Sequence, residues 1–278
     1  MEKFVIEDNS GACENQPLLE DLINHIKIFE NILLGKMECT PSSCSKWILR
    51  LEEDKSCPFL QEYGKIKVGV TFLKNVYVLV CYLTRYFTSH FANKNVACHA
   101  KIFEELCRNK NAFADACKNS ALWNELEKKD KNANNQERNI IDNNKIIFCH
   151  VIHYFICHEI GHTVHWGDGP IVEKRCDDEA TKVMFKLLKK NIKKLHMDAD
   201  CSLKIAQIMI GGFTAQAFIA HYVKSNSSCD NFDDEPHNNQ NNYPRTFERI
   251  YNFVQQFNKM WNYGHVTELQ NDSVLSVG

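Results

Sequence analysis

The sequence predicts an α+β fold that is mostly helical, with a small sheet and a helical N-terminal region. Two observations lead to this prediction. Most apolar segments repeat their hydrophobic residues at the three- and four-residue spacing of a helix, whereas residues 65–72 alternate as a strand does. The chain has 278 residues, of which 44% are hydrophobic, enough for a substantial core.

Residues 1–127 are predicted to form an N-terminal region, helical with possible strands, that packs on the remainder of the chain. Its clearest element is an amphipathic helix over residues 16–34, where apolar side chains recur along one face. The other elements expected here are a short helix over 46–51, a strand over 65–72, an apolar run to Phe87 that fits either strand or helix, and a helix over 102–126.

Residues 145–262 are predicted to form the functional core, and 263–278 a polar tail. Residues 128–144 are polar and rich in asparagine, which is typical of a surface linker. The apolar run from Lys145 to Cys157 then predicts a buried helix that ends near Gly167. Further helices are expected over 172–195, 203–223 and 246–261.

The buried helix carries two histidines four residues apart, His158 and His162, with Glu159 beside the first. Positions i and i+4 lie on one face of a helix, so both imidazoles can reach a single zinc ion. A glutamate at the second position can take a proton from a water activated by that metal. The pattern predicts a zinc site with Glu159 as general base.

Two histidines do not complete a catalytic zinc site, which usually has three protein ligands. The next predicted helix begins near Pro170 and brings Glu173 close to level with His162 if the two helices are antiparallel. Asp177 lies one turn further and can reach the first histidine. Glu173 is the favoured third ligand, with Asp177 as its main rival and Asp178 and Glu179 left open.

The HExxH pattern followed by Glu-x-x-x-Asp resembles the glutamate-ligand zinc peptidases, or gluzincins. The longer stretch from Glu173 to Ala180 is similar to that of HtpX-type and ImmA/IrrE-type peptidases, although the gap from His162 to Glu173 is shorter here. Chain size and the mid-chain motif also resemble Lit-type phage-exclusion peptidases. This resemblance covers roughly residues 145–262 and implies a zincin-like metalloprotease fold, Glu173 as zinc ligand, and Asp177 holding His158 without touching the metal.

A weaker resemblance to HtpX-type peptidases begins at Tyr243, where Tyr243-Pro244 precedes Arg249-Ile250 at the family's spacing. The family has histidine where this chain has tyrosine. The resemblance implies that Tyr243 donates a hydrogen bond to the oxyanion of the tetrahedral intermediate. His237 is the alternative donor.

The composition of the chain limits the kinds of binding partner that are expected. The formal charge of −2 gives no indication of nucleic-acid binding. Residues 68–87 and 203–223 are apolar but carry charged or polar side chains, so each is expected to be a core element and no membrane insertion is predicted. The first residues lack the apolar region of a secretory signal, which predicts a cytoplasmic location and 13 reduced cysteines.

The predicted function is that of a zinc-dependent endopeptidase, which hydrolyses peptide bonds of a protein or peptide substrate with a water activated by Zn²⁺. The alternative is a non-catalytic protein that keeps a zincin-like scaffold for regulation or partner binding. An intact Glu159 favours the enzyme, because a binding scaffold does not need the general base.

Overall fold

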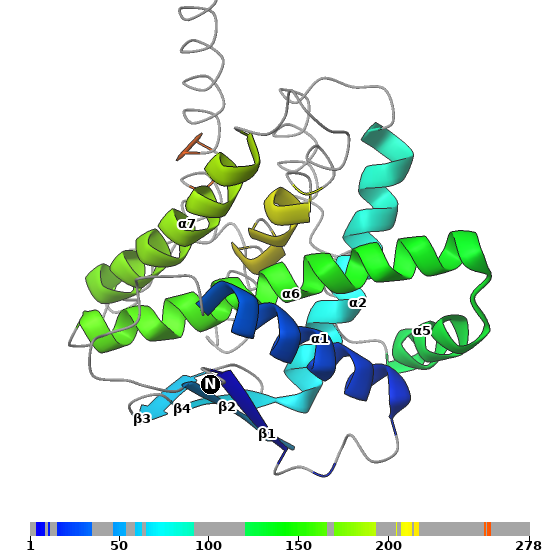
Figure 1. Cartoon of the computed structure of the whole chain (residues 1–278), viewed down its shortest axis with the longest axis horizontal. Helices are drawn as coiled ribbons and strands as arrows, with labels where there is room; N and C mark the ends of the chain where they lie inside the picture. Colours follow the sequence, from blue (N-terminus) through cyan, green and yellow to red (C-terminus); the bar gives the residue numbers. More distant parts are fainter. Residues whose placement is uncertain are drawn as a thin grey trace, which may run out of the picture.

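The structure is a computed structural model, and it describes residues 4–8, 11, 16–34, 47–53, 59–62, 65–91, 120–165, 170–192, 204, 207–212, 214–216, 253 and 255–256. The described part has an α+β fold dominated by helices, as the sequence predicts (Figure 1). Its elements are β1 (Phe4–Asp8), α1 (Pro17–Leu34), β2 (Trp47–Glu52), β3 (Phe59–Glu62), β4 (Lys65–Gly69), α2 (Val70–Phe91), α5 (Ser120–Asn132), α6 (Asn135–Val164) and α7 (Pro170–Ile192).

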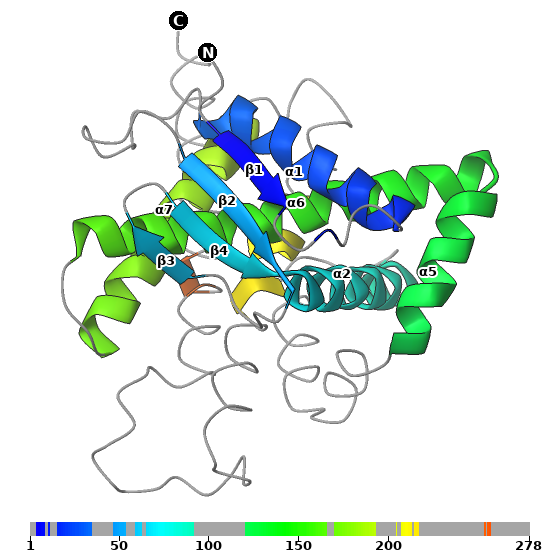
Figure 2. The same ribbon diagram turned by 90° about the horizontal axis from the view of Figure 1, so that it is seen from below.

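The four strands form one sheet in the order β1-β2-β4-β3. Strands β1, β2 and β4 are parallel, and β3 pairs with β4 in the antiparallel sense at one edge. Helices α1 and α6 lie over one face of this sheet (Figures 1 and 2). Buried side chains alternate along the strands, as in Trp47, Leu49 and Leu51 of β2, because every second side chain points to the helical layer.

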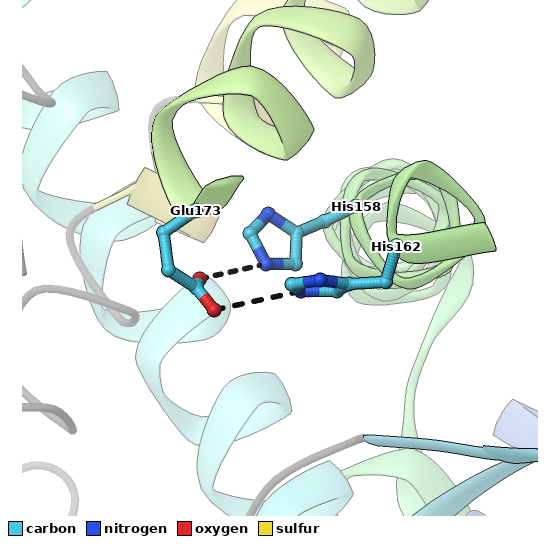
Figure 3. Close-up of side chains that lie close together, drawn as sticks. All are labelled: His158, His162 and Glu173. Carbon is cyan, nitrogen blue, oxygen red and sulfur yellow. Dashed lines mark ion pairs between the residues drawn. The ribbon is translucent and has the colours of Figure 1, made fainter. Parts of the chain in front are cut away.

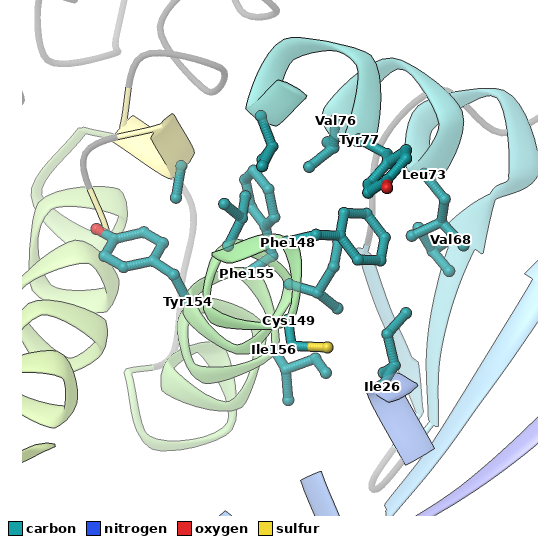
Figure 4. Close-up of a cluster of buried hydrophobic side chains, with 14 of the residues drawn as sticks. Ile26, Val68, Leu73, Val76, Tyr77, Phe148, Cys149, Tyr154, Phe155 and Ile156 are labelled. Carbon is teal, nitrogen blue, oxygen red and sulfur yellow. The ribbon is translucent and has the colours of Figure 1, made fainter. Parts of the chain in front are cut away.

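Helix α6 is the centre of the molecule. Every residue from Ile147 to Gly161 is buried, so this helix is enclosed on all sides rather than on one stripe. Phe148 packs edge-on against Tyr77 of α2 with ring centroids 5.6 Å apart, and Ile156 and Cys149 point away from α2 (Figure 4). The prediction of a buried helix leading into the two histidines is therefore confirmed.

The short helix predicted over residues 46–51 is wrong, because these residues form strand β2. The segment Trp-Ile-Leu-Arg-Leu-Glu is too short to distinguish the two periods from sequence. Parallel pairing with both β1 and β4 decides for the strand, since it satisfies the backbone on both sides.

The linker predicted over residues 128–144 is also wrong, because α5 continues to Asn132 and α6 begins at Asn135. Asn134 caps α6: its side chain accepts hydrogen bonds from the backbone N–H groups of Gln136 and Glu137, and Glu137 accepts one from the Asn134 N–H. This reciprocal capping box satisfies N–H groups that the first turn leaves without partners. The first turns of α6 are exposed, so they show no apolar periodicity.

Other predicted bounds shift by a few residues. The helix predicted over 16–34 is α1, the strand predicted over 65–72 ends at Gly69, and the apolar run after it is helix α2. Of the helices predicted over 203–223 and 246–261, the described residues are helical: 204, 207–212, 214–216, 253, 255 and 256. The tail at 263–278 lies outside the described residues, and the domain division at 127 stays a prediction.

None of the helices in the described ranges combines the length and apolar character needed to cross a bilayer. The four cysteines whose surroundings are described are free, and three of them are buried: Cys149, Cys157 and Cys176.

A fully buried ion pair joins α1 to α6. Nδ1 of His153 lies 2.9 Å from one carboxylate oxygen of Glu30, and both side chains are inaccessible to solvent. Burial alone would lower the pKa of His153, but Cys157 and Glu30 raise it well above 6.5. Since the folded-state pKa is the higher one, this stabilisation is complete below pH 6.5 and is lost as the pH rises through the pKa of folded His153.

We predict that Glu30→Gln lowers the free energy of unfolding by about 3–5 kcal/mol, because it leaves one buried charge without its partner. Glu179→Gln, which removes an exposed partner of Lys182, should cost at most about 1 kcal/mol. Urea unfolding near pH 6 measures both. Equal losses of unfolding free energy in the two variants would contradict the conclusion that the Glu30–His153 pair holds α1 against α6.

Candidate metal centre

The last two turns of α6 present His158 and His162 on one face. Their ring centroids lie 5.0 Å apart with the ring planes inclined by 78°. Helix α7 runs back along α6 in the antiparallel sense, and Glu173 lies in its first turn. The three side chains converge between the two helices (Figure 3).

Distances within the group suit coordination of one ion. Nε2 of His158 lies 3.2 Å from Oε2 of Glu173, and Nε2 of His162 lies 3.5 Å from Oε1. Ligand atoms at about 2.0–2.2 Å from a tetrahedral zinc are themselves about 3.4 Å apart. One ligand atom from each of the three residues lies within 4.8 Å of the others, and no second group of this kind occurs among the described residues.

One side of the group is open to solvent. His158 is buried, whereas 25% of the His162 side chain and 18% of the Glu173 side chain are exposed. A metal held here could therefore keep one coordination position for water or substrate, which distinguishes catalytic zinc from a closed structural site.

The helices approach closely at Gly161, which lies between the two histidine turns. A Cβ atom placed on Gly161 would lie 3.1 Å from Cα and 3.2 Å from Cβ of Cys176. These contacts are tighter than ordinary van der Waals contact, so only glycine fits without displacing α7. This approach brings Glu173 level with both histidines despite the short segment between them.

Asp177 lies behind His158, on the side away from Glu173. Its Oδ1 is 3.0 Å from Nδ1 of His158, a hydrogen-bond distance although the N–H is not well aligned with the acceptor. Burial alone would lower the pKa of His158, but the carboxylates of Asp177 and Glu173 raise it to about 9. A proton on Nδ1 leaves Nε2 as the nitrogen that faces Glu173 and His162.

The other acidic candidates lie elsewhere. Glu159 is buried next to His158, close enough for its charge to raise the pKa of that imidazole. Glu179 forms an exposed pair with Lys182 at 2.6 Å. Asp178 is not in the group, and burial raises the pKa of its carboxyl. Among the four acidic candidates for the third ligand, Glu173 is the one that the structure groups with both histidines.

Tyr243 and His237, the candidate oxyanion donors, lie outside the described residues. His150 and His153 of α6 are buried against Phe29 and Glu30 of α1, away from the histidine pair. Tyr154, for which the sequence predicted no role, also reaches this region: its hydroxyl contacts Asp177. Its place four residues before His158 was a signal for the same helix face, but tyrosine in an apolar run is more often a core residue.

A family model described as Peptidase U49 matches residues 95–268, more than half of the chain. Comparisons with curated proteins and with solved structures found no match. Helices α6 and α7 bring together two imidazoles and a carboxylate, and the family match is to a peptidase. These residues therefore form a candidate metal centre within a peptidase. The chain belongs to the peptidase U49 family.

We predict that Gly161→Ala weakens metal binding by about tenfold without removing a ligand, because overpacking at a helix contact costs about 1–3 kcal/mol and α7 must move outward. Equilibrium dialysis against zinc measures the change. Cys176→Ala is the matched control: it removes only the sulfur from the same contact and should retain wild-type affinity. A Cys176→Ala protein that loses zinc would instead identify the thiol as a ligand.

Proposed function

We propose that this protein is a zinc-dependent endopeptidase. The observation that carries the proposal is the convergence of His158, His162 and Glu173, with Glu159 beside them, in a chain of the peptidase U49 family. Two imidazoles and one carboxylate form a common ligand set of catalytic zinc. When bound, zinc would supply the Lewis acidity that helps water attack a peptide carbonyl.

Glu159 is proposed as the general base. It takes a proton from the attacking water and passes it to the amine that leaves when the C–N bond breaks. Its burial beside His158 keeps the carboxylate away from bulk water, which strengthens its electrostatic interactions. Asp177 is proposed to hold His158 with Nε2 free for the metal. Tyr243 or His237 is proposed as donor to the oxyanion.

The position of the sheet favours the proposal that the substrate is an extended segment of a protein. Within the described sheet β3 is an edge strand, and it lies beside the C-terminal half of α6 (Figures 1 and 2). The backbone of an edge strand can pair with an extended peptide through main-chain hydrogen bonds. Recognition of this kind binds a segment anywhere along a chain, which favours cleavage at internal bonds.

We predict that Glu159→Gln lowers turnover by about 10²–10⁴-fold while zinc stays bound at wild-type stoichiometry, since the amide cannot accept the proton. The measurement combines metal analysis with labelling of new N-termini in a protein extract treated with the purified protein. Glu173→Gln serves as the contrast and should lose zinc as well as activity.

Wild-type protein that binds zinc and generates no new N-termini in any extract would favour the alternative, a non-catalytic zincin-like binding protein. Cleavage at the wild-type rate by Glu159→Gln would exclude the proposed base.

We predict that zinc uptake near pH 7 releases about one proton from His158, because an imidazole with a pKa of about 9 is protonated at that pH and must lose its proton from Nε2 to bind metal. Zinc affinity should therefore rise with pH up to about 9. The raised pKa stabilises the metal-free fold below pH 6.5, and this stabilisation is lost as the pH approaches 9.

Titration calorimetry in two buffers of different ionisation enthalpy counts the released protons. Asp177→Asn, which removes the first of the carboxylates that hold the proton, should reduce the count. Zinc binding with no buffer dependence would contradict the prediction.

A further inference from the structure

A line of buried polar side chains continues beyond Asp177. The hydroxyl of Tyr154 lies 3.4 Å from both the backbone oxygen and Oδ1 of Asp177, and it accepts a hydrogen bond from Nε2 of Gln216. Tyr154, Asp177 and Gln216 are all at least nine-tenths buried. The line therefore runs from Gln216 through Tyr154 and Asp177 to His158, out of reach of bulk water.

Donors and acceptors alternate consistently along this line. The amide of Gln216 donates to the Tyr154 hydroxyl, whose single hydrogen is then directed at Asp177. Oδ1 of Asp177 is also the atom nearest Nδ1 of His158. One carboxylate oxygen thus lies near two donor groups, the Tyr154 hydroxyl at 3.4 Å and Nδ1 of His158 at 3.0 Å.

The residues that supply Gln216 are held tightly against α6. A Cβ atom on Gly211 would lie 2.5 Å from Cβ of His150, so the backbone around residue 211 touches α6 directly. The Tyr154 side chain projects from α6 toward this segment, whereas Phe148 projects toward Tyr77 of α2 (Figure 4). The hydroxyl is therefore enclosed by α6, α7 and the helical residues 207–212 and 214–216.

We propose that Tyr154 and Gln216 are positioning residues of the metal centre, which fix the Asp177 carboxylate and through it the orientation of His158. This inference rests on the proposed function, because it assumes that His158 binds zinc. Removal of a partner that orients a ligand typically costs 10–100-fold in metal affinity. Tyr154 acts one contact further away over a long hydrogen bond, so its removal should cost about three- to tenfold.

The test compares Tyr154→Phe with Tyr77→Phe. Tyr77 is buried in α2 and contacts Cys81, so its variant also removes one buried hydroxyl but leaves the metal centre untouched. Zinc dissociation constants come from competition with a chelator, and the absorption bands of the Co²⁺-substituted proteins report ligand geometry. Tyr154→Phe should weaken zinc binding by about three- to tenfold and shift the Co²⁺ bands, whereas Tyr77→Phe should change neither.

A double-mutant cycle separates positioning from a general loss of stability. In an Asp177→Ala background, Tyr154→Phe should have no further effect on zinc affinity, because the residue that transmits its influence is gone. Gln216→Met should shift affinity in the same direction as Tyr154→Phe and by less. It provides a second variant if the first folds poorly.

Wild-type zinc affinity and unshifted Co²⁺ bands in both Tyr154→Phe and Gln216→Met would overturn the inference and leave the proposed function intact. An effect of Tyr154→Phe that persists in the Asp177→Ala background would also overturn it. Wild-type protein that binds no zinc would overturn the proposed function itself, and the inference with it.

Discussion

The contact of α6 with α7 at Gly161 and Cys176 is the constraint on which the candidate metal centre depends. Because glycine has no side chain, the two backbones come close enough for Glu173 to reach both imidazoles. The antiparallel course of α7 then places Asp177 behind His158, where it also contacts the hydroxyl of Tyr154 from α6. The positions of Glu173 and Asp177 relative to the two histidines therefore follow from one close approach of the helices. A wider separation would leave the ligands present but too far apart to share an ion.

The rest of the fold holds α6 in place. This helix is buried on all sides from Ile147 to Gly161, and polar contacts tie it to other parts of the chain. Glu30 of α1 pairs with His153, while Lys145 is held by Asp21 and Asp130 at 2.5 and 2.9 Å. Glu30 and His153 are both fully buried, and Lys145 is buried although its two partners are partly exposed, so a shift of the helix would leave a buried charge without its partner. A rigid support keeps the ligand atoms near their productive arrangement.

Sequence alone predicts the part of the site that depends on local periodicity. The spacing of His158 and His162 predicts that both lie on one helix face, and the helix predicted next along the chain carries Glu173 and Asp177. The segment 46–51 shows the limit: six residues fit a helix or a strand, and pairing with two remote strands decides. The exposed start of α6 depends on a cap at Asn134 rather than on apolar spacing. The partner of His153 is 123 residues away, a distance that no local pattern encodes.

The Glu30–His153 pair has a consequence for the order in which the molecule assembles. His162 and Glu173 are 11 residues apart (173 − 162), so the ligand-bearing hairpin of α6 and α7 needs only local contacts, and such contacts form quickly during folding. The pair with Glu30 must close a far longer loop and incurs a larger entropy cost. The candidate ligands thus belong to a hairpin that forms from local contacts and folds quickly. The contact with α1 that makes this hairpin rigid is non-local and forms more slowly. A nascent hairpin would gather its ligands before α1 has fixed the helix that carries two of them.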